Sequence, residues 1–356
     1  MDASDWHAFC RAPSPIPPTP VGQANTMPVR GEQRQRYARE VEQFLLRCPA
    51  ESPLHERLKE ALREEVETIE LEPYGARTIT ALTAPFTAGK STTVKAVARD
   101  LYRDWMADYH ADERPRWNPP GQADVEADRI PIIYVNLQSD TSSKDLYAQI
   151  LTFMGHGASW TRSQLAINTS KAFSIHGVRL VILDDAHMLR THLKQGQATL
   201  DAIKAIATEL GEVGGMMILV GAWTADSDLL DDPQIRGRLS LHQLGVYSIG
   251  SNQERALWQR LLKVWQEKIE QFLPGMDTGD LSQSAARYLY ERTQGYVGDL
   301  AKCLSQVTGR AIRDGRDTIN NDDLKMVRLS ARAHDHELGS GTTGRRKPRK
   351  NKRIVG

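Results

Sequence analysis

The sequence has few cysteines, almost no net charge and no long apolar run. Its three cysteines, Cys10, Cys48 and Cys303, are far apart and lack the spacing of a metal site, so we expect reduced thiols. The net charge is only +1, so no global field attracts nucleic acid. We expect no signal peptide, and no apolar run approaches the roughly 20 residues that span a membrane. These absences predict a cytoplasmic protein without a membrane segment.

The stretch from Thr78 to Thr92 is the most informative part of the chain. An apolar run within it predicts a buried strand, and Gly89 begins a helix after a turn of small residues. This layout is that of a P-loop, G-x-x-x-x-G-K-S/T, with Ala84 at the first glycine position. Backbone N–H groups of such a turn bind phosphate, Lys90 reaches the β and γ oxygens of ATP, and Ser91 holds Mg²⁺. The predicted nucleotide-binding residues are Ala84, Pro85, Thr87, Ala88, Gly89, Lys90, Ser91 and Thr92.

Strand and helix patterns alternate after the P-loop, as in a parallel sheet with helices on both faces. The expected strands lie within residues 79–82, 130–137, 178–184, 216–223 and 241–249. The predicted fold class is therefore an α/β P-loop NTPase domain with a five-stranded parallel sheet. A helical pattern over 31–72 is expected to brace this domain, and the proline-rich residues 1–30 are expected to form a disordered arm.

After Ser251 the pattern changes to helices only. We expect helices over residues 256–269, 281–292, 297–314 and 321–332, which together form an all-helical lid. The last residues lack a core pattern and include a basic run with seven cations between Arg345 and Arg353. The expected parts are an arm (1–30), a nucleotide-binding domain with its helical preface (31–250), a lid (251–332) and a disordered basic tail (333–356).

A second motif lies 94 positions after Lys90, where an apolar run ends in Asp184 and Asp185. A carboxylate at the carboxyl end of a parallel strand lies where ligands bind in open α/β sheets. Asp184 is expected to hold Mg²⁺ together with Ser91, directly or through water. Asp185 is expected to orient or activate the water that attacks the γ-phosphate. The alternative, two unrelated strand-to-helix turns, stays open from the residues alone.

The order of these motifs resembles that of the AAA+ ATPases. Within that class the chain is most similar to the TniB/TnsC group of transposition regulators, relatives of the MuB and IstB ATPases. The likeness spans residues 35–330 and rests on the P-loop and on Leu183 to His187, a form of the group's Asp-Glu-x-His ending. Looser similarities lie at residues 219–221, 232–238, 258–265, 272–274 and 295–300.

The resemblance implies roles for residues around the two motifs. Asp185 stands where the group usually has Glu, which implies slow ATP hydrolysis. His187 would sense the γ-phosphate or a neighbouring subunit, and Thr224 stands near the usual polar sensor after the fourth strand. Either Arg236 or Arg238 would reach into the nucleotide site of the next subunit. Each of these side chains could instead be an ordinary surface group, and the sequence does not rank the two arginines.

The resemblance also implies partners. ATP-bound subunits of this group assemble as rings or helical filaments on double-stranded DNA and recruit or activate a transposase. Lys144 and Arg162 are the expected DNA contacts in the segment after the second strand, which also holds Lys171. The basic tail is expected to bind phosphate backbones without reading sequence, unless it serves only solubility or binds a protein partner. Its predicted contacts are Arg345, Arg346, Lys347, Arg349 and Lys350.

Other functions stay open beside this one. A helicase loader or a defence-system ATPase would share the fold and the two motifs. A nucleotide-gated scaffold without hydrolysis would account for Ala84 and Asp185. A metabolic kinase is disfavoured, because the helical lid is C-terminal and no acceptor site is evident. The sequence thus predicts an AAA+ regulator of transposition that depends on ATP and Mg²⁺.

Overall fold

The structure is a computed structural model, and it describes ten stretches of the chain. These are residues 1–19, 31–47, 52–69, 71–72, 74–109, 115–122, 124–138, 141–189, 194–222 and 232–340. The chain divides into two compact units. The first contains residues 1–16 and 49–245, and the second contains residues 17–48 and 246–356.

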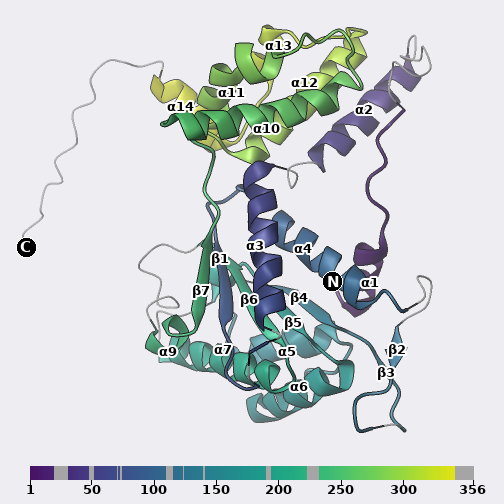
Figure 1. The fold of residues 1–356 in the computed structure, drawn as a ribbon, viewed down its shortest axis with the longest axis vertical. Coiled ribbons are helices and arrows are strands. Elements are labelled where there is room, and N and C mark those ends of the chain that lie inside the picture. The colour runs from purple at the N-terminus through teal and green to yellow at the C-terminus, as the bar shows by residue number, and fades with distance from the viewer. Residues whose placement is uncertain are drawn as a thin grey trace, which may run out of the picture. The chain divides into compact units, whose positions relative to one another are not determined.

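A five-stranded parallel sheet forms the centre of the first unit (Figure 1). Its strands, in spatial order, are β4 (Ile132–Asn136), β5 (Leu180–Asp184), β6 (Met216–Gly221), β1 (Ile79–Thr83) and β7 (Leu239–Gln243). The inner strands are buried along nearly their whole length, as expected when both faces of a parallel sheet are covered. This arrangement confirms the predicted α/β class with five parallel strands.

Two groups of helices accompany this sheet. In one group α1 (Ala3–Arg11) and α3 (Pro53–Ile69) pack against α4 (Lys90–Trp105). In the other, α5 (Ser143–Phe153), α6 (Arg162–His176) and α7 (Lys194–Glu212) pack against one another. Capping boxes at Ser142 and Thr161 fix the starts of α5 and α6. Short elements complete the unit: β2 (Arg116–Trp117), β3 (Ala127–Asp128), the 3-10 turn η3 (Ala186–Met188) and α9 (Pro233–Arg236).

In the second unit, all regular secondary structure of the described residues is helical. It comprises α2 (Glu32–Leu46), α10 (Asn252–Glu270), the π-helical turn η4 (Asp280–Ser284), α11 (Ala286–Thr293), α12 (Val297–Asp314), α13 (Asn321–Met326) and α14 (Ala331–Ser340). Among the described helices, α2 and α12 pack together most extensively. Their contact includes an ion pair of 2.7 Å between Glu42 and Arg313, and Gly309 leaves room for the Glu42 side chain.

Three expectations about the chain's outer segments differ from the structure. Within the supposed disordered arm, α1 is an ordered helix that buries Trp6 and Cys10. The helical preface does not brace one domain, because α2 belongs to the second unit and α3 to the first. The supposed disordered tail begins with α14, which continues to Ser340. The basic run that follows lies outside the described residues. In the described part of the chain, no helix combines the length and the apolar character that a membrane crossing needs.

Candidate nucleotide-binding site

The turn between β1 and α4 has the backbone of a phosphate-binding loop. Thr87 and Gly89 have positive φ values of 63° and 92°. Gly89 caps α4 without any side-chain hydrogen bond, so the N–H groups of the first helical turn stay available to a ligand. Ala84 is not among the described residues with positive φ, and its N–H donates to the Gly221 carbonyl at 3.2 Å. The P-loop therefore forms without a glycine at position 84.

The Lys90 side chain lies at this turn and has no carboxylate partner among the described residues. It is only 7% exposed, and its Nζ lies 5.3 Å from the centre of the Phe86 ring. Phe86 is 62% exposed, so the ring covers the ammonium group from the solvent side of the loop. Ser91 is half-buried in the same helical turn, and Thr92 is exposed. Phosphate oxygens would give Lys90 the anionic partner that the chain itself does not supply.

A buried histidine of α3 contacts the phosphate-binding loop. His55 Nε2 lies 2.8 Å from the Ala88 carbonyl oxygen, and Ser52 Oγ hydrogen-bonds to Nδ1. A Cβ atom at Gly89 would come within 2.5 Å of His55 Nε2, so glycine is required for close packing as well as for its φ. Burial lowers the pKa of His55, which favours the neutral ring that donates from Nε2.

Asp184 lies at the carboxyl end of β5, at the same edge of the sheet as the P-loop. Because β6 separates β1 from β5, these strand ends are about 10 Å apart. Oδ1 of Asp184 accepts a hydrogen bond of 2.9 Å from the Asp185 N–H, and Oδ2 accepts one from the Tyr134 hydroxyl. Burial and the adjacent Asp184 charge raise the pKa of Tyr134 far above its ordinary value, so the phenol stays a donor. Two hydrogen bonds thus orient the Asp184 carboxylate.

The segment after β5 contacts the P-loop through one aromatic pair. Asp185 has a φ of 54°, and the chain then turns into η3. His187 in η3 packs its ring edge against Phe86, with 5.5 Å between ring centres. Its Nδ1 lies 4.0 Å from an Asp185 carboxylate oxygen and 3.4 Å from the Ala222 N–H. The structure therefore brings Lys90, Phe86, His187 and Asp185 into one connected cluster.

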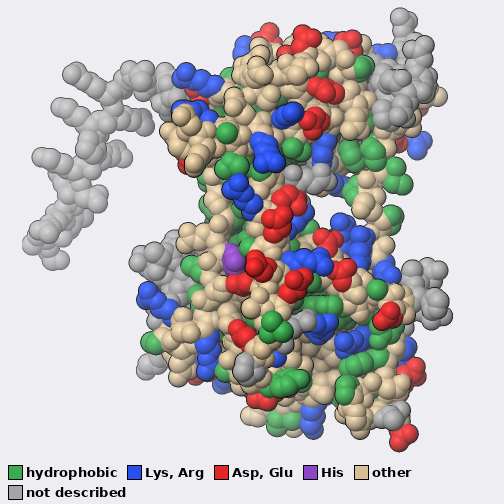
Figure 2. Space-filling view, in the orientation of Figure 1, with side chains coloured by type: hydrophobic (Ala, Val, Ile, Leu, Met, Phe, Trp, Pro, Cys, Tyr) green, Lys and Arg blue, Asp and Glu red, His purple; other side chains and the backbone are tan. Residues whose placement is uncertain are grey.

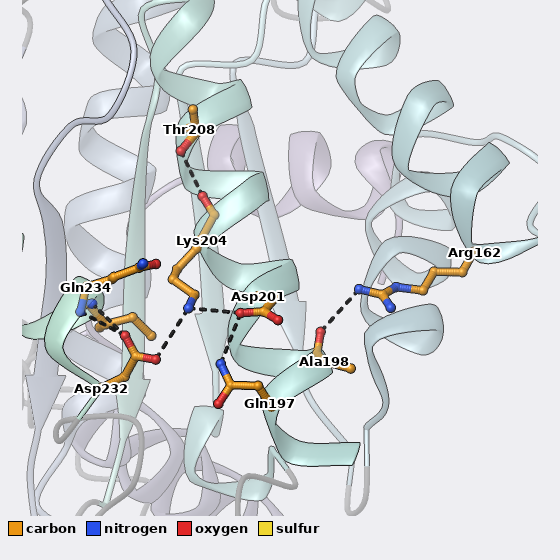
Figure 3. A network of polar contacts seen from close by, with 9 residues as sticks. Arg162, Gln197, Ala198, Asp201, Lys204, Thr208, Asp232 and Gln234 are labelled. Atoms are coloured by element: carbon orange, nitrogen blue, oxygen red, sulfur yellow. Dashed lines mark hydrogen bonds and ion pairs between the residues drawn. The ribbon is translucent and has the colours of Figure 1, made fainter. Parts of the chain in front are cut away.

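The candidate trans-acting arginines lie on and beside α9, and the first residues of this helix belong to the polar network of Figure 3. Arg236 and Arg238 are both exposed, and neither has an ion-pair partner among the described residues. Asp232 accepts hydrogen bonds from the N–H groups of Gln234 (2.9 Å) and Ile235 (3.0 Å) at the start of α9. Lys204 of α7 pairs with Asp232 at 3.3 Å and with Asp201 at 2.9 Å. Burial alone would raise the pKa of Asp232, but these N–H groups and Lys204 lower it below its ordinary value.

The structure describes only some of the other predicted site residues. Lys144, Arg162 and Lys171 are exposed on α5 and α6, and Arg162 donates to the Ala198 carbonyl at 3.4 Å (Figure 3). On the face seen in Figure 2, basic and acidic side chains are interspersed within each unit. Thr224 and the basic run over 345–350 lie outside the described residues.

Ser91 and Asp184 suit Mg²⁺, which prefers oxygen ligands and keeps several waters. The Asp184 carboxylate retains acceptor capacity after its two hydrogen bonds. In the described stretches, no group of three or more His, Cys, Asp or Glu side chains could hold a metal alone. The chain would thus supply part of the coordination and substrate phosphates would supply more, as is usual for Mg²⁺.

Sequence reasoning missed three residues of this site: His55, Phe86 and Tyr134. Phe86 stands inside the P-loop, and its aromatic character among small residues was the one visible signal. His55 and Tyr134 lie in a helix and a strand whose patterns indicate only burial. Their contacts with Ala88 and Asp184 join positions 33 and 50 residues apart, so they depend on the fold.

Comparisons with known proteins agree with this geometry. Residues 110–249 match the model of the family described as "Bacterial TniB protein". No curated protein matches the sequence significantly. The Aeropyrum pernix ORC2 protein, solved in ADPNP–ADP complexes, aligns with a TM-score of 0.50 and 14% identity over 75% of this chain and 65% of its own. Its ADP form aligns with the same score and identity over 79% and 68%. Cdc6p from Pyrobaculum aerophilum has a TM-score of 0.49 and 16% identity over 76% and 65%.

At such low identity the two ORC2 structures speak only for the fold. The chain spans less than two thirds of the length of the first ORC2 structure. The sheet, the P-loop and the helical second unit agree with an AAA+ fold, and the TniB match covers β4, β5, β6 and the Asp184 motif. Residues 110–249 are thus similar to the TniB family, and the fold is that of an AAA+ domain.

Proposed function

We propose that this protein is an ATP-dependent, DNA-binding regulator of transposition. The observation that carries the proposal is the shared sheet edge of Lys90 and Asp184. There an ammonium group without a carboxylate partner among the described residues and an oriented carboxylate lie at the ends of parallel strands. The TniB match over residues 110–249 favours transposition over the other uses of this site.

In this proposal the P-loop N–H groups and Lys90 bind the phosphates of ATP. Ser91 and Asp184 hold Mg²⁺, which when bound would neutralise charge on the β and γ oxygens. Asp185 orients the attacking water and accepts its proton. Arg236 or Arg238 of an adjacent subunit stabilises charge that develops on the γ-phosphate. The exposure of both arginines supports a role between subunits.

With ATP bound, subunits assemble on double-stranded DNA as a ring or helical filament and recruit or activate a transposase. Lys144, Arg162 and the basic run over 345–350 contact the phosphate backbone. Their exposure on α5 and α6 supports this role for the first two. Hydrolysis then releases the subunits from DNA.

ATP turnover measured with and without duplex DNA tests the proposal. We expect slow turnover that duplex DNA stimulates. Tight ATP binding without turnover in either condition would instead favour the nucleotide-gated scaffold, for which the short acid Asp185 is the supporting observation. Affinity for a replicative helicase in place of a transposase would favour a helicase loader.

A further inference from the structure

The position of Tyr134 in the sheet explains how it reaches Asp184. Tyr134 lies opposite Ile182 in the register of β4 and β5, while Asp184 lies opposite Asn136. Side chains two residues apart on a strand share a face, so Tyr134 and Asp184 are diagonal neighbours on one face. Tyr134 is 3% exposed, and its hydroxyl donates to Asp184 Oδ2.

The Tyr134 ring is held by α1. The ring of Trp6 stacks on it, with 5.1 Å between centres and 7° between planes, and Trp6 is 1% exposed. Lys95, one turn after Ser91 in the P-loop helix, places Nζ 4.8 Å from the centre of the Tyr134 ring. Tyr134 therefore contacts α1, the P-loop helix and Asp184 together.

Several polar contacts fix α1 to α4 and to the turn that follows α4. His7 Nδ1 lies 2.7 Å from the Tyr102 hydroxyl. Arg103 donates to the Cys10 carbonyl at 2.7 Å, and Arg11 donates to the carbonyls of Met106 (2.8 Å) and Tyr109 (3.1 Å). These contacts make α1 an integral part of the first unit.

We propose that Tyr134 is a positioning residue for Asp184 and that the stacking of Trp6 holds Tyr134 in place, so that α1 supports Mg²⁺ binding. The inference rests on the proposed role of Asp184. A carboxylate with two fixed hydrogen bonds presents its remaining lone pairs in one direction. A carboxylate with one hydrogen-bond partner can rotate about its Cβ–Cγ bond. The Tyr134 hydroxyl thus acts as an outer partner of the metal site.

The test is the Mg²⁺ concentration needed for half-maximal binding of a fluorescent ATP analogue to the full-length protein. Tyr134→Phe should raise this concentration roughly tenfold or more, in the range typical of outer partners of metal ligands. Binding in EDTA should stay as in the wild type. Tyr147→Phe is the matched control, because it removes the hydroxyl of another buried tyrosine of the same unit, on α5, which has no described hydrogen bond to α1 or Asp184. An equal Mg²⁺ requirement in Tyr134→Phe and Tyr147→Phe would overturn the assignment.

A second pair of variants tests the role of α1. Trp6→Leu removes the ring stack and should raise the Mg²⁺ requirement, while Trp6→Phe keeps a ring and should restore it. Wild-type behaviour of Trp6→Leu would refute the part assigned to α1. This pair also tests the proposal should Tyr134→Phe fail to fold. If the wild type bound no nucleotide at any Mg²⁺ concentration, the proposed nucleotide site itself would be wrong, which is a different result.

Discussion

The backbone at Asp185 accounts for an aspartate where the resembled group has glutamate. Its φ of 54° lies in the left-handed region, which costs most residues about 1–2 kcal/mol and which aspartate visits more readily. In that conformation a short polar side chain can hydrogen-bond to the nearby backbone, and a longer side chain is stabilised less by such hydrogen bonds. The shorter acid therefore follows from the turn into η3 and is compatible with a catalytic role.

Asp185→Asn should separate binding from chemistry. The amide keeps the size and the turn but cannot accept a proton, so turnover should fall by roughly 10² or more while nucleotide affinity stays near wild type. Single-turnover ATP hydrolysis and equilibrium binding measure the two quantities. Unchanged hydrolysis in this variant would exclude Asp185 as the base.

His55 should make stability depend on pH. Its folded pKa is below the unfolded value of about 6.5, so the unfolded chain binds the proton more tightly. The stabilisation is therefore present above about pH 6.5 and is lost as pH falls from there toward the folded pKa. His55→Gln keeps a donor for Ala88 but does not titrate. Its thermal midpoint should fall less than that of the wild type between pH 8 and pH 5, and equal falls would contradict this account.

At the scale of elements, α9 depends on Asp232. This residue caps a helix of four residues, and the buried Ile235 anchors that helix. Asp232→Ala should lower the free energy of unfolding by about 1–2 kcal/mol, because it leaves two N–H groups without an acceptor. Asp201→Ala is the control, since Asp201 is exposed and its pair with Lys204 is worth about 0–1 kcal/mol. Denaturant unfolding of both variants checks this, and equal losses would contradict the capping role.

Elements with a strong local pattern were predicted well from the sequence. The inner strands are continuous apolar runs, and α12 has the predicted bounds because its apolar face repeats at helical spacing. The edge strand β7 begins two residues before the expected start and ends well before the expected end, because it is only half-buried and its apolar signal is weak. The helix α1 escaped notice because prolines follow it closely, although Asp2 and Asp5 form a capping box.

The site was predictable where chemistry is local in sequence. Asp184 is the last residue of β5, and Lys90 and Ser91 begin α4 after a short turn from β1, so strand prediction places all three at one edge of a parallel sheet. The supporting contacts of His55 and Tyr134 could be predicted only with knowledge of the strand order and of the way α3 packs. The order of the strands depends on how the crossover connections run. The residue pattern of one strand carries no information about those connections.

At the scale of the whole molecule, neither unit is continuous in sequence. The chain forms α1 in the first unit, α2 in the second and α3 in the first again, before it returns to the second after residue 245. Removing the first 48 residues would therefore take a helix from each unit. The helical preface is thus divided between the units: α2 belongs to the second, and α3 belongs to the first, where its His55 contacts the P-loop.

The basic run over 345–353 should add affinity for DNA without sequence preference. Its removal should weaken duplex binding about equally across sequences and reduce the slope of log affinity against log salt, because fewer counterions are released. Fluorescence anisotropy over a salt series measures the slope. A slope equal to that of the full chain would assign the run a different role.

In the proposed function, nucleotide bound between Lys90 and Asp184 controls assembly on DNA. The most direct measurement is sedimentation of the protein with duplex DNA and Mg²⁺, with and without ATP. We predict ATP-dependent assemblies for the wild type and for Lys263→Ala, a control at an exposed lysine of α10. Lys90→Ala should form none, because the phosphates lose their cationic partner. ATP-dependent assembly of Lys90→Ala at the wild-type level would contradict the account.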